Sequence, residues 1–240
     1  MKTRWSFSAF LMILVAALFT GCGSDFSGYK LDSLTPSEIT AGNGDFVLLL
    51  SGANFKSDTT VLFGTLQLNA KLINHNSLQI VVPSSAVANA GIVDVAVTGS
   101  PTSSPLKFTI KNPLPAIASL SQPEVPLNSA SISLEVTGSN FVSTSTVQLG
   151  DVSIKPGSYT STHLTVSVPD VLLTTAQVLN FSVVNPGPGG GASNAVNFSV
   201  LNPAPAVTAL SMESTPLNST SVALDVSGAN FLPSSVVTVG

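Results

Sequence analysis

The chain has 240 residues, of which 8% are charged and 44% hydrophobic, with a formal net charge of −4. Past residue 21 it has no Arg, and six Lys stand against twelve acidic residues, so this part carries a net charge near −6. Nucleic-acid binding relies on clustered Lys and Arg, and the charge balance excludes that class of partner. Abundant Ser, Thr, Asn, Gly and β-branched residues, in a regular apolar pattern, favour an ordered all-β protein.

Residues 1–21 have the organisation of a cleaved signal peptide. Lys2 and Arg4 provide a positive start, and residues 10–19 form an apolar core that is short for a membrane span. The core is followed by Gly21 and by Cys22, the only Cys of the chain. One Cys excludes disulfides within a domain, so core packing must hold each domain together.

The segment around Cys22 resembles the lipobox of bacterial lipoproteins, in which small residues precede a Cys that is lipidated and becomes the new N-terminus. Phe19 departs from the Leu that this family usually has three positions before the Cys. The alternative is secretory cleavage nearby with a free Cys, but an unpaired thiol is a liability in a secreted protein. The resemblance implies lipid attachment at Cys22 and a membrane-anchored, extracytoplasmic protein.

A flexible tether over residues 22–30 follows the predicted lipid site. Lipoproteins that enterobacteria retain in the inner membrane have Asp directly after the lipidated Cys. This chain has Gly23 at that position. The expected location is therefore the outer membrane or the cell surface.

One short phrase occurs three times and organises the rest of the chain: residues 51–55, 137–141 and 227–231, each containing Gly-x-Asn-Phe. Phe55 and Phe141 are 86 residues apart, and Phe141 and Phe231 are 90 apart. Solenoid repeats are shorter, so this spacing indicates a tandem array of small domains. In each phrase, Gly permits a sharp bend, Asn tolerates left-handed backbone, and Phe returns to the core.

Strands are predicted around each phrase from apolar alternation with a period of two. The first repeat alternates at Phe46, Leu48 and Leu50, with Leu49 outward as a candidate contact residue, and the third at Val222, Leu224 and Val226. Later strands follow at 61–64, 78–82, 93–97 and 106–110 in repeat one, at 147–150, 164–168, 179–183 and 196–200 in repeat two, and at 237–240 in repeat three. About seven short strands per repeat, with no substantial helix, predict a β-sandwich.

Pro-rich segments at residues 112–115 and 202–205 are the expected linkers, and alternate prolines favour an extended, semi-rigid backbone. We therefore expect domain 1 over residues 31–112, domain 2 over 113–202, and a third domain over 203–240, standing end to end. The third repeat stops at Gly240, the counterpart of Gly64 and Gly150. It is expected to be an incomplete sandwich and the chain a fragment of a longer protein.

The repeats resemble the IPT/TIG family of immunoglobulin-like domains over residues 31–240. The resemblance lies in the Gly-x-Asn-Phe ending of the first long strand, the Val-x-x-Gly strand, the Leu-x-Val-x-Val-Pro strand at 164–169, and the run at 183–187 followed by Ser193, Asn194 and Phe198. It implies tandem immunoglobulin-like sandwiches. The family's members include receptors, transcription factors and bacterial surface proteins, so it does not fix a function.

Catalytic, metal and cofactor residues are not expected. His75 and His163 occupy different repeat positions, lack acidic or Cys neighbours in sequence, and are expected in solvated loops. Asp151 and Asp170 are too few oxygen donors for Ca²⁺. The Gly-rich run at 187–191 leads into a strand, whereas phosphate-binding loops lead into a helix, so it is expected to be a hairpin loop.

The leading hypothesis is a non-enzymatic, lipid-anchored array that acts as a spacer, scaffold or adhesion module, with protein or polysaccharide ligands at the cell surface. The alternative is a carbohydrate-binding module or an accessory region of a larger secreted carbohydrate-active enzyme. Tyr29 near the tether and Tyr159, expected in a loop, are the Tyr residues left for stacking on sugars, and they are not expected to form an aromatic platform.

Overall fold

A computed structural model of the chain describes residues 28–99 and 101–238. These residues form β-strands joined by turns, with two short 3-10 helices, η1 (Ser84–Val87) and η2 (Asp170–Leu173). The all-β class expected from the sequence is confirmed. Within the described ranges, no helix is long and apolar enough to cross a membrane.

Domain 1 is a sandwich of two sheets that pack face to face. One sheet has the strand order β1-β3-β7-β6 and the other β2-β9-β8-β4-β5; β2 pairs with β9 in parallel, and the other pairs are antiparallel. The strands are β1 (Lys30–Thr35), β2 (Glu38–Thr40), β3 (Phe46–Ala53), β4 (Thr60–Phe63), β5 (Leu66–Asn69), β6 (Lys71–Asn74), β7 (Ser77–Val82), β8 (Gly91–Thr98) and β9 (Leu106–Lys111).

Domain 2 repeats this topology. Its sheets run β10-β12-β16-β15 and β11-β19-β17-β13-β14, with β18 as a short addition on β17. The strands are β10 (Ala116–Leu120), β11 (Glu124–Pro126), β12 (Ile132–Ser139), β13 (Thr146–Leu149), β14 (Val152–Ile154), β15 (Ser158–Tyr159), β16 (His163–Val168), β17 (Gln177–Asn185), β18 (Gly191–Ala192) and β19 (Val196–Leu201).

Alternation along the strands forms the two cores. In β3, Leu48 and Leu50 are buried whereas Val47 and Leu49 face outward. Leu134 and Val136 of β12 are the buried counterparts in domain 2. Each domain closes around its own cluster of buried aliphatic and Phe side chains, so each has a complete hydrophobic core.

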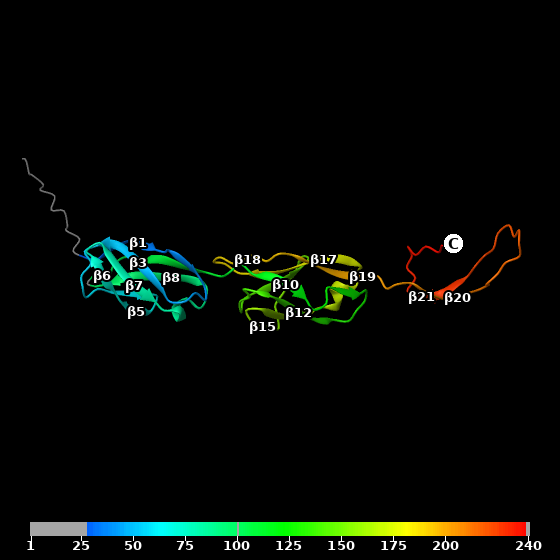
Figure 1. Ribbon diagram of the computed structural model, residues 1–240, viewed down its shortest axis with the longest axis horizontal. Helices are drawn as coiled ribbons and strands as arrows, with labels where there is room; N and C mark the ends of the chain where they lie inside the picture. The colour runs from blue at the N-terminus through cyan, green and yellow to red at the C-terminus, as the bar shows by residue number, and fades with distance from the viewer. Residues whose placement is uncertain (1–27, 100, 239–240) are drawn as a thin grey trace, which may run out of the picture.

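The two sandwiches stand in line, as Figure 1 shows. The chain enters domain 1 at one end, passes from β9 to β10 between the domains, and leaves domain 2 from β19 toward β20 (Ala206–Leu210). The pair β20 and β21 (Val226–Ala229) lies at the opposite end of the molecule from Gly28, the first described residue.

The third repeat differs from the expectation in its strands. Its alternating segment was predicted to begin at Val222, but the strand starts at Val226, and the described part of the 237–240 segment forms no strand. In domains 1 and 2 the corresponding segments pair with β7, β8, β16 and β17. In the described part of the third repeat, β20 and β21 pair only with each other, and Val222 and Phe231 are each 43% exposed.

Candidate functional site

The Gly-x-Asn-Phe turn has the same geometry in all three repeats. A Cβ added to Gly138 would lie 2.1 Å from the carbonyl oxygen of Ala116 and 2.5 Å from Phe141 Cζ, and Gly52 and Gly228 are enclosed in the same way. The glycine therefore lets the Phe ring and the first strand pack against its backbone. This position has a structural role.

The Asn of each turn fixes the segment that enters its domain. Asn54, Asn140 and Asn230 all have positive φ, which Asn tolerates better than most residues. Each side-chain Nδ2 donates to a carbonyl oxygen 26 residues upstream, which in domain 2 is that of Leu114, at 2.8 Å. The repeated Asn thus attaches the entering segment to the sandwich.

The junction between the two domains contains several hydrogen bonds that cross from one domain to the other. The N–H of Asn112 donates to the carbonyl oxygen of Pro188 at 2.8 Å, and the N–H of Gly190 donates to the carbonyl oxygen of Asn112 at 2.8 Å. The side chain of Asn112 donates to the carbonyl oxygen of Pro186, also at 2.8 Å. The Gly-rich run is therefore a hairpin loop, as predicted, and it contacts the end of domain 1.

A groove of about 420 Å³ lies beside this junction. Domain 1 contributes Gly42 and Asn89, and domain 2 contributes Asn140 and Tyr159. Tyr159 belongs to β15 and is 51% exposed, so its predicted place in a loop was wrong. The residues lie far apart in the sequence, and no local motif identified this groove in advance.

The other predicted positions do not converge on a site. His75 is exposed, with Nδ1 3.2 Å from the carbonyl oxygen of Phe55, while His163 is exposed in β16 and not in the predicted loop. Asp151 and Asp170 are exposed in separate segments. Within the described ranges, no three His, Cys, Asp or Glu side chains gather as a metal would require. Cys22 lies outside the described residues.

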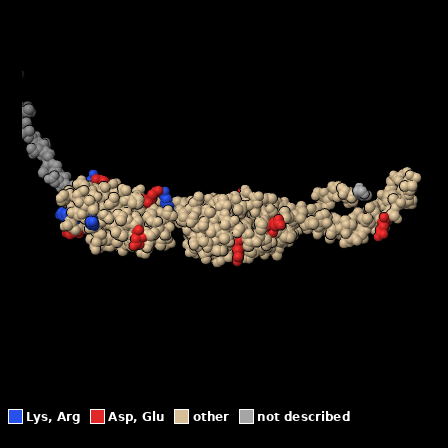
Figure 2. Space-filling view, viewed as in Figure 1, with Lys and Arg blue, Asp and Glu red and all other residues tan. Residues whose placement is uncertain are grey.

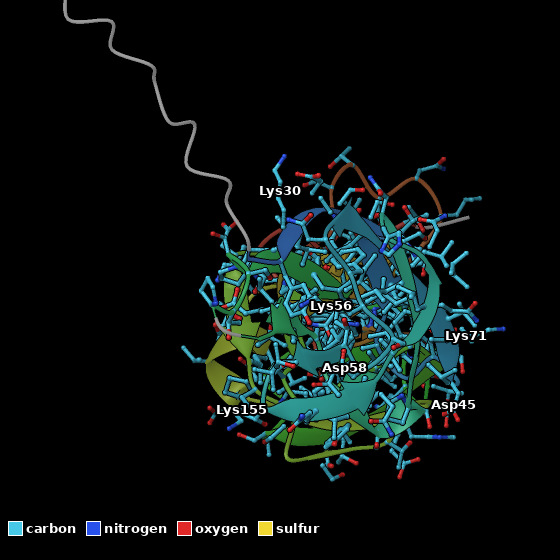
Figure 3. All side chains as sticks on the ribbon, turned by 90° about the vertical axis from the view of Figure 1, so that its left-hand side faces the viewer. Lys30, Asp45, Lys56, Asp58, Lys71 and Lys155 are labelled. Atoms are coloured by element: carbon cyan, nitrogen blue, oxygen red, sulfur yellow. The ribbon has the colours of Figure 1, made fainter. Side chains whose placement is uncertain are left out.

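Charged side chains are dispersed over the surface. Three exposed ion pairs are present in domain 1: Lys30–Asp32, Lys107–Asp94 and Lys111–Glu38. Figure 2 shows both Lys and acidic side chains on domain 1. On the visible face of the remaining chain, the charged side chains are all acidic. In the end view of Figure 3, Lys30 projects from one side of domain 1, and Asp45 and Lys71 project from another.

One carboxyl group has a perturbed pKa. The N–H of Ser84 donates to Asp45 Oδ1 at 2.8 Å, and this hydrogen bond lowers the pKa of Asp45 below its ordinary value of 3.8. Asp45 precedes β3, and Ser84 begins η1. The bond therefore joins the segment before β3 to η1 and has a structural role.

Two consecutive sandwiches of this topology define a tandem array of immunoglobulin-like domains. The IPT/TIG domain model matches residues 30–110 and 115–200, so the chain belongs to the IPT/TIG domain family. A search of curated proteins finds no match to the sequence.

Similar solved structures share low identity with the chain. A protein crystallised with a xylogluco-oligosaccharide is 14% identical, with a TM-score of 0.44, and the match covers 85% of this chain and 47% of that one. SGBP-B from the mixed-linkage glucan utilization locus of Bacteroides ovatus, in complex with a heptasaccharide, is 12% identical, with a TM-score of 0.30 and coverage of 82% and 53%. The extracellular region of plexin A4 is 11% identical, with a TM-score of 0.32 and coverage of 72% and 21%. The chain thus spans about half or less of these proteins' length.

Proposed function

We propose that this protein is a non-enzymatic, lipid-anchored array of immunoglobulin-like domains that acts outside the cytoplasm as a spacer, scaffold or adhesion module. The observation that carries the proposal is the linear arrangement in Figure 1, with Gly28 at one end and the β20–β21 pair at the other. An attachment close to Gly28 would hold whatever follows β21 at a distance set by two closed sandwiches.

The sequence supports lipid attachment at Cys22. A positive start, an apolar core and a following Cys are the features of a lipoprotein signal, so Cys22 would carry the lipid. Each buried methylene of an acyl chain contributes about 0.8 kcal/mol to membrane binding. The outer membrane or the cell surface is the expected location.

Membrane fractionation with a matched control tests the anchor. Full-length protein made in a bacterial host with labelled palmitate is expected to be labelled and to sediment with the membranes. Cys22→Ser is expected to remove the label and release the protein, whereas Ser24→Ala, two residues away, is expected to preserve both. Unlabelled wild-type protein, or Cys22→Ser protein that stays membrane-bound, would contradict the proposal.

The absence of enzymatic activity is a separate part of the proposal. It is supported by the dispersed His and acidic side chains, because catalysis needs groups that converge on one substrate atom. The expected result is no turnover of ester, peptide and glycoside substrates by the purified chain. Turnover that survives further purification would refute this part and leave the anchor intact.

The groove beside Tyr159 supports a second candidate function, the binding of a polysaccharide. An exposed aromatic ring can stack on a sugar, and the amides of Asn89 and Asn140 can hydrogen-bond to hydroxyl groups. Affinity gels containing a polysaccharide should then retard the protein. Tyr159→Ala is expected to abolish the retardation and Tyr159→Phe to preserve it. Equal mobility with and without polysaccharide would eliminate this candidate for the polymers used.

A further inference from the structure

The loop that connects β17 to β19 in domain 2 is four residues longer than its counterpart in domain 1. Eleven positions separate Val97 from Phe108, whereas fifteen separate the equivalent Val183 and Phe198. This difference alone accounts for the two repeat spacings of 86 and 90 residues. The extra length lies where the chain turns back toward domain 1.

The longer loop pairs with the last residue of domain 1. Asn112 follows directly after β9, and it forms a parallel bridge with Gly189. The two backbone hydrogen bonds described above, to Pro188 and from Gly190, flank this bridge. The Asn112 side-chain bond adds a third connection.

Close approach of the two backbones requires Gly189. Its φ is +68°, and an added Cβ would lie 2.6 Å from Lys111 Cβ and 2.7 Å from the carbonyl oxygen of Asn112. Any side chain at this position must push the loop away from domain 1. Gly187, in the same loop, has no atom within 4 Å of an added Cβ.

A second connection comes from a buried amide. Asn185, at the end of β17, is 1% exposed and donates through Nδ2 to the carbonyl oxygens of Pro113 and Asn140, at 2.8 and 2.7 Å. Its Oδ1 accepts from Ser145 Oγ at 2.6 Å. A buried polar side chain with all these partners fixes the linker backbone in place.

Domain 1 has a different solution at the equivalent position. Gly99 stands where domain 2 has Asn185, and the ring of Tyr29 occupies the space, 2.2 Å from where a Cβ would be. In domain 1 the aromatic ring of Tyr29 therefore fills this position, whereas in domain 2 the Asn185 amide fills it and hydrogen-bonds to the linker.

The second junction lacks comparable contacts. Among the described residues, the cross-segment hydrogen bond of residues 202–205 runs forward, from Asn230 Nδ2 to the carbonyl oxygen of Ala204. None runs back from this junction to a loop of domain 2.

We propose that residues 186–190 form an interdomain clamp that holds domains 1 and 2 as one rigid body, while the junction at residues 202–205 acts as a hinge. The partner of the clamp is the preceding repeat of the same chain, at Lys111 and Asn112. The proposal concerns relative domain motion and holds whether or not Cys22 carries a lipid.

Residual dipolar couplings measured on the Cys22→Ser chain from residue 22 onward test the clamp, because both sandwiches keep complete cores in it. Backbone N–H couplings of domains 1 and 2 are expected to fit a single alignment tensor. Gly189→Ala is expected to split them into two tensors of different magnitude, and Gly187→Ala to preserve the single tensor. A shortened loop that lacks residues 187–190 provides a second variant and is expected to behave like Gly189→Ala.

Chemical shifts of the core amides of domain 2 report whether each variant remains folded. Two tensors in the unmodified chain would overturn the clamp. A single tensor in both Gly189→Ala and the shortened chain would also overturn it, because the loop would then not be what holds the domains together.

Discussion

Replacing Phe141 by Ala should destabilise domain 2 alone. Its side chain is 3% exposed and belongs to the core cluster of that domain, and its ring packs against Gly138. Truncation of a buried Phe costs roughly 3–5 kcal/mol because the surrounding structure fills the cavity only in part. A domain of this size has a total stability on the order of 5–15 kcal/mol, so the loss is a large share.

Phe231 provides the matched control. It has the same place in the third repeat but is 43% exposed, and in the described residues β20 and β21 form a two-stranded sheet of their own. Phe231→Ala should therefore change the stability of domain 2 by no more than about 0.5 kcal/mol, the usual range for an exposed substitution away from a core.

Tyrosine fluorescence distinguishes the domains, because Tyr29 packs in domain 1 and Tyr159 lies in domain 2. In a chain from residue 22 with Tyr29→Phe, the urea transition reported by Tyr159 should move down by about 2 M for Phe141→Ala, given a typical dependence of stability on urea. It should not move for Phe231→Ala. Equal shifts for both variants, or none for Phe141→Ala, would refute the assignment of Phe141 to a closed core.

Two further predictions follow from the turns. Gly138→Ala should destabilise domain 2 in urea unfolding, since an added Cβ would lie 2.1 Å from the carbonyl oxygen of Ala116, while Gly157→Ala should be neutral because the nearest atom would be 3.8 Å away. Asp45→Asn should make the stability of domain 1 less dependent on pH in acid. The hydrogen bond from Ser84 lowers the folded-state pKa of Asp45 below 3.8. The stabilisation that the Asp45 carboxylate contributes is therefore present above pH 3.8 and is lost as the pH falls through the folded-state pKa. An unaltered pH dependence of the domain 1 transition would contradict that role for Asp45.

The strands β3, β4, β7, β8 and β9 of domain 1 and their counterparts in domain 2 were predictable because alternation expresses burial directly. The sequence patterns did not predict β1, β2, β5 and β6 of domain 1, or β10, β11, β14, β15 and β18 of domain 2. Leu48 and Leu50 point into the core in the predicted register, and Leu49 faces outward as expected. The repeated Gly-x-Asn-Phe phrase correctly indicated positive φ at Asn in all three repeats. The Phe is buried in domains 1 and 2, whereas Phe231, also expected in a core, is 43% exposed.

The strand segments of the third repeat were not predictable by the same reasoning. Alternation around Val222 shows which face a strand would bury, but a strand also needs a neighbour for its backbone groups. Asp225 hydrogen-bonds to Ser211 through its N–H and its carbonyl oxygen, but residues 222–224 pair with no strand of the described chain, and the strand covers only 226–229.

The groove and the interdomain contacts depend on residues that meet only in three dimensions. Asn112 and Pro188 are far apart in sequence, the first in the Pro-rich linker and the second in the Gly-rich loop, and nothing in either segment indicates the other as its partner. The difference between the two repeat spacings was a visible indication that one loop is longer. It did not indicate that the extra residues contact the preceding domain.

The scarcity of Lys beyond domain 1 has a consequence for proteolysis. Past Lys111 the chain contains one Lys, Lys155, and no Arg. Lys155 is exposed between β14 and β15 but is followed by Pro156, and trypsin-like proteases do not readily cleave a Lys–Pro bond. Residues 112–240 therefore remain one uncut segment during digestion by such an enzyme.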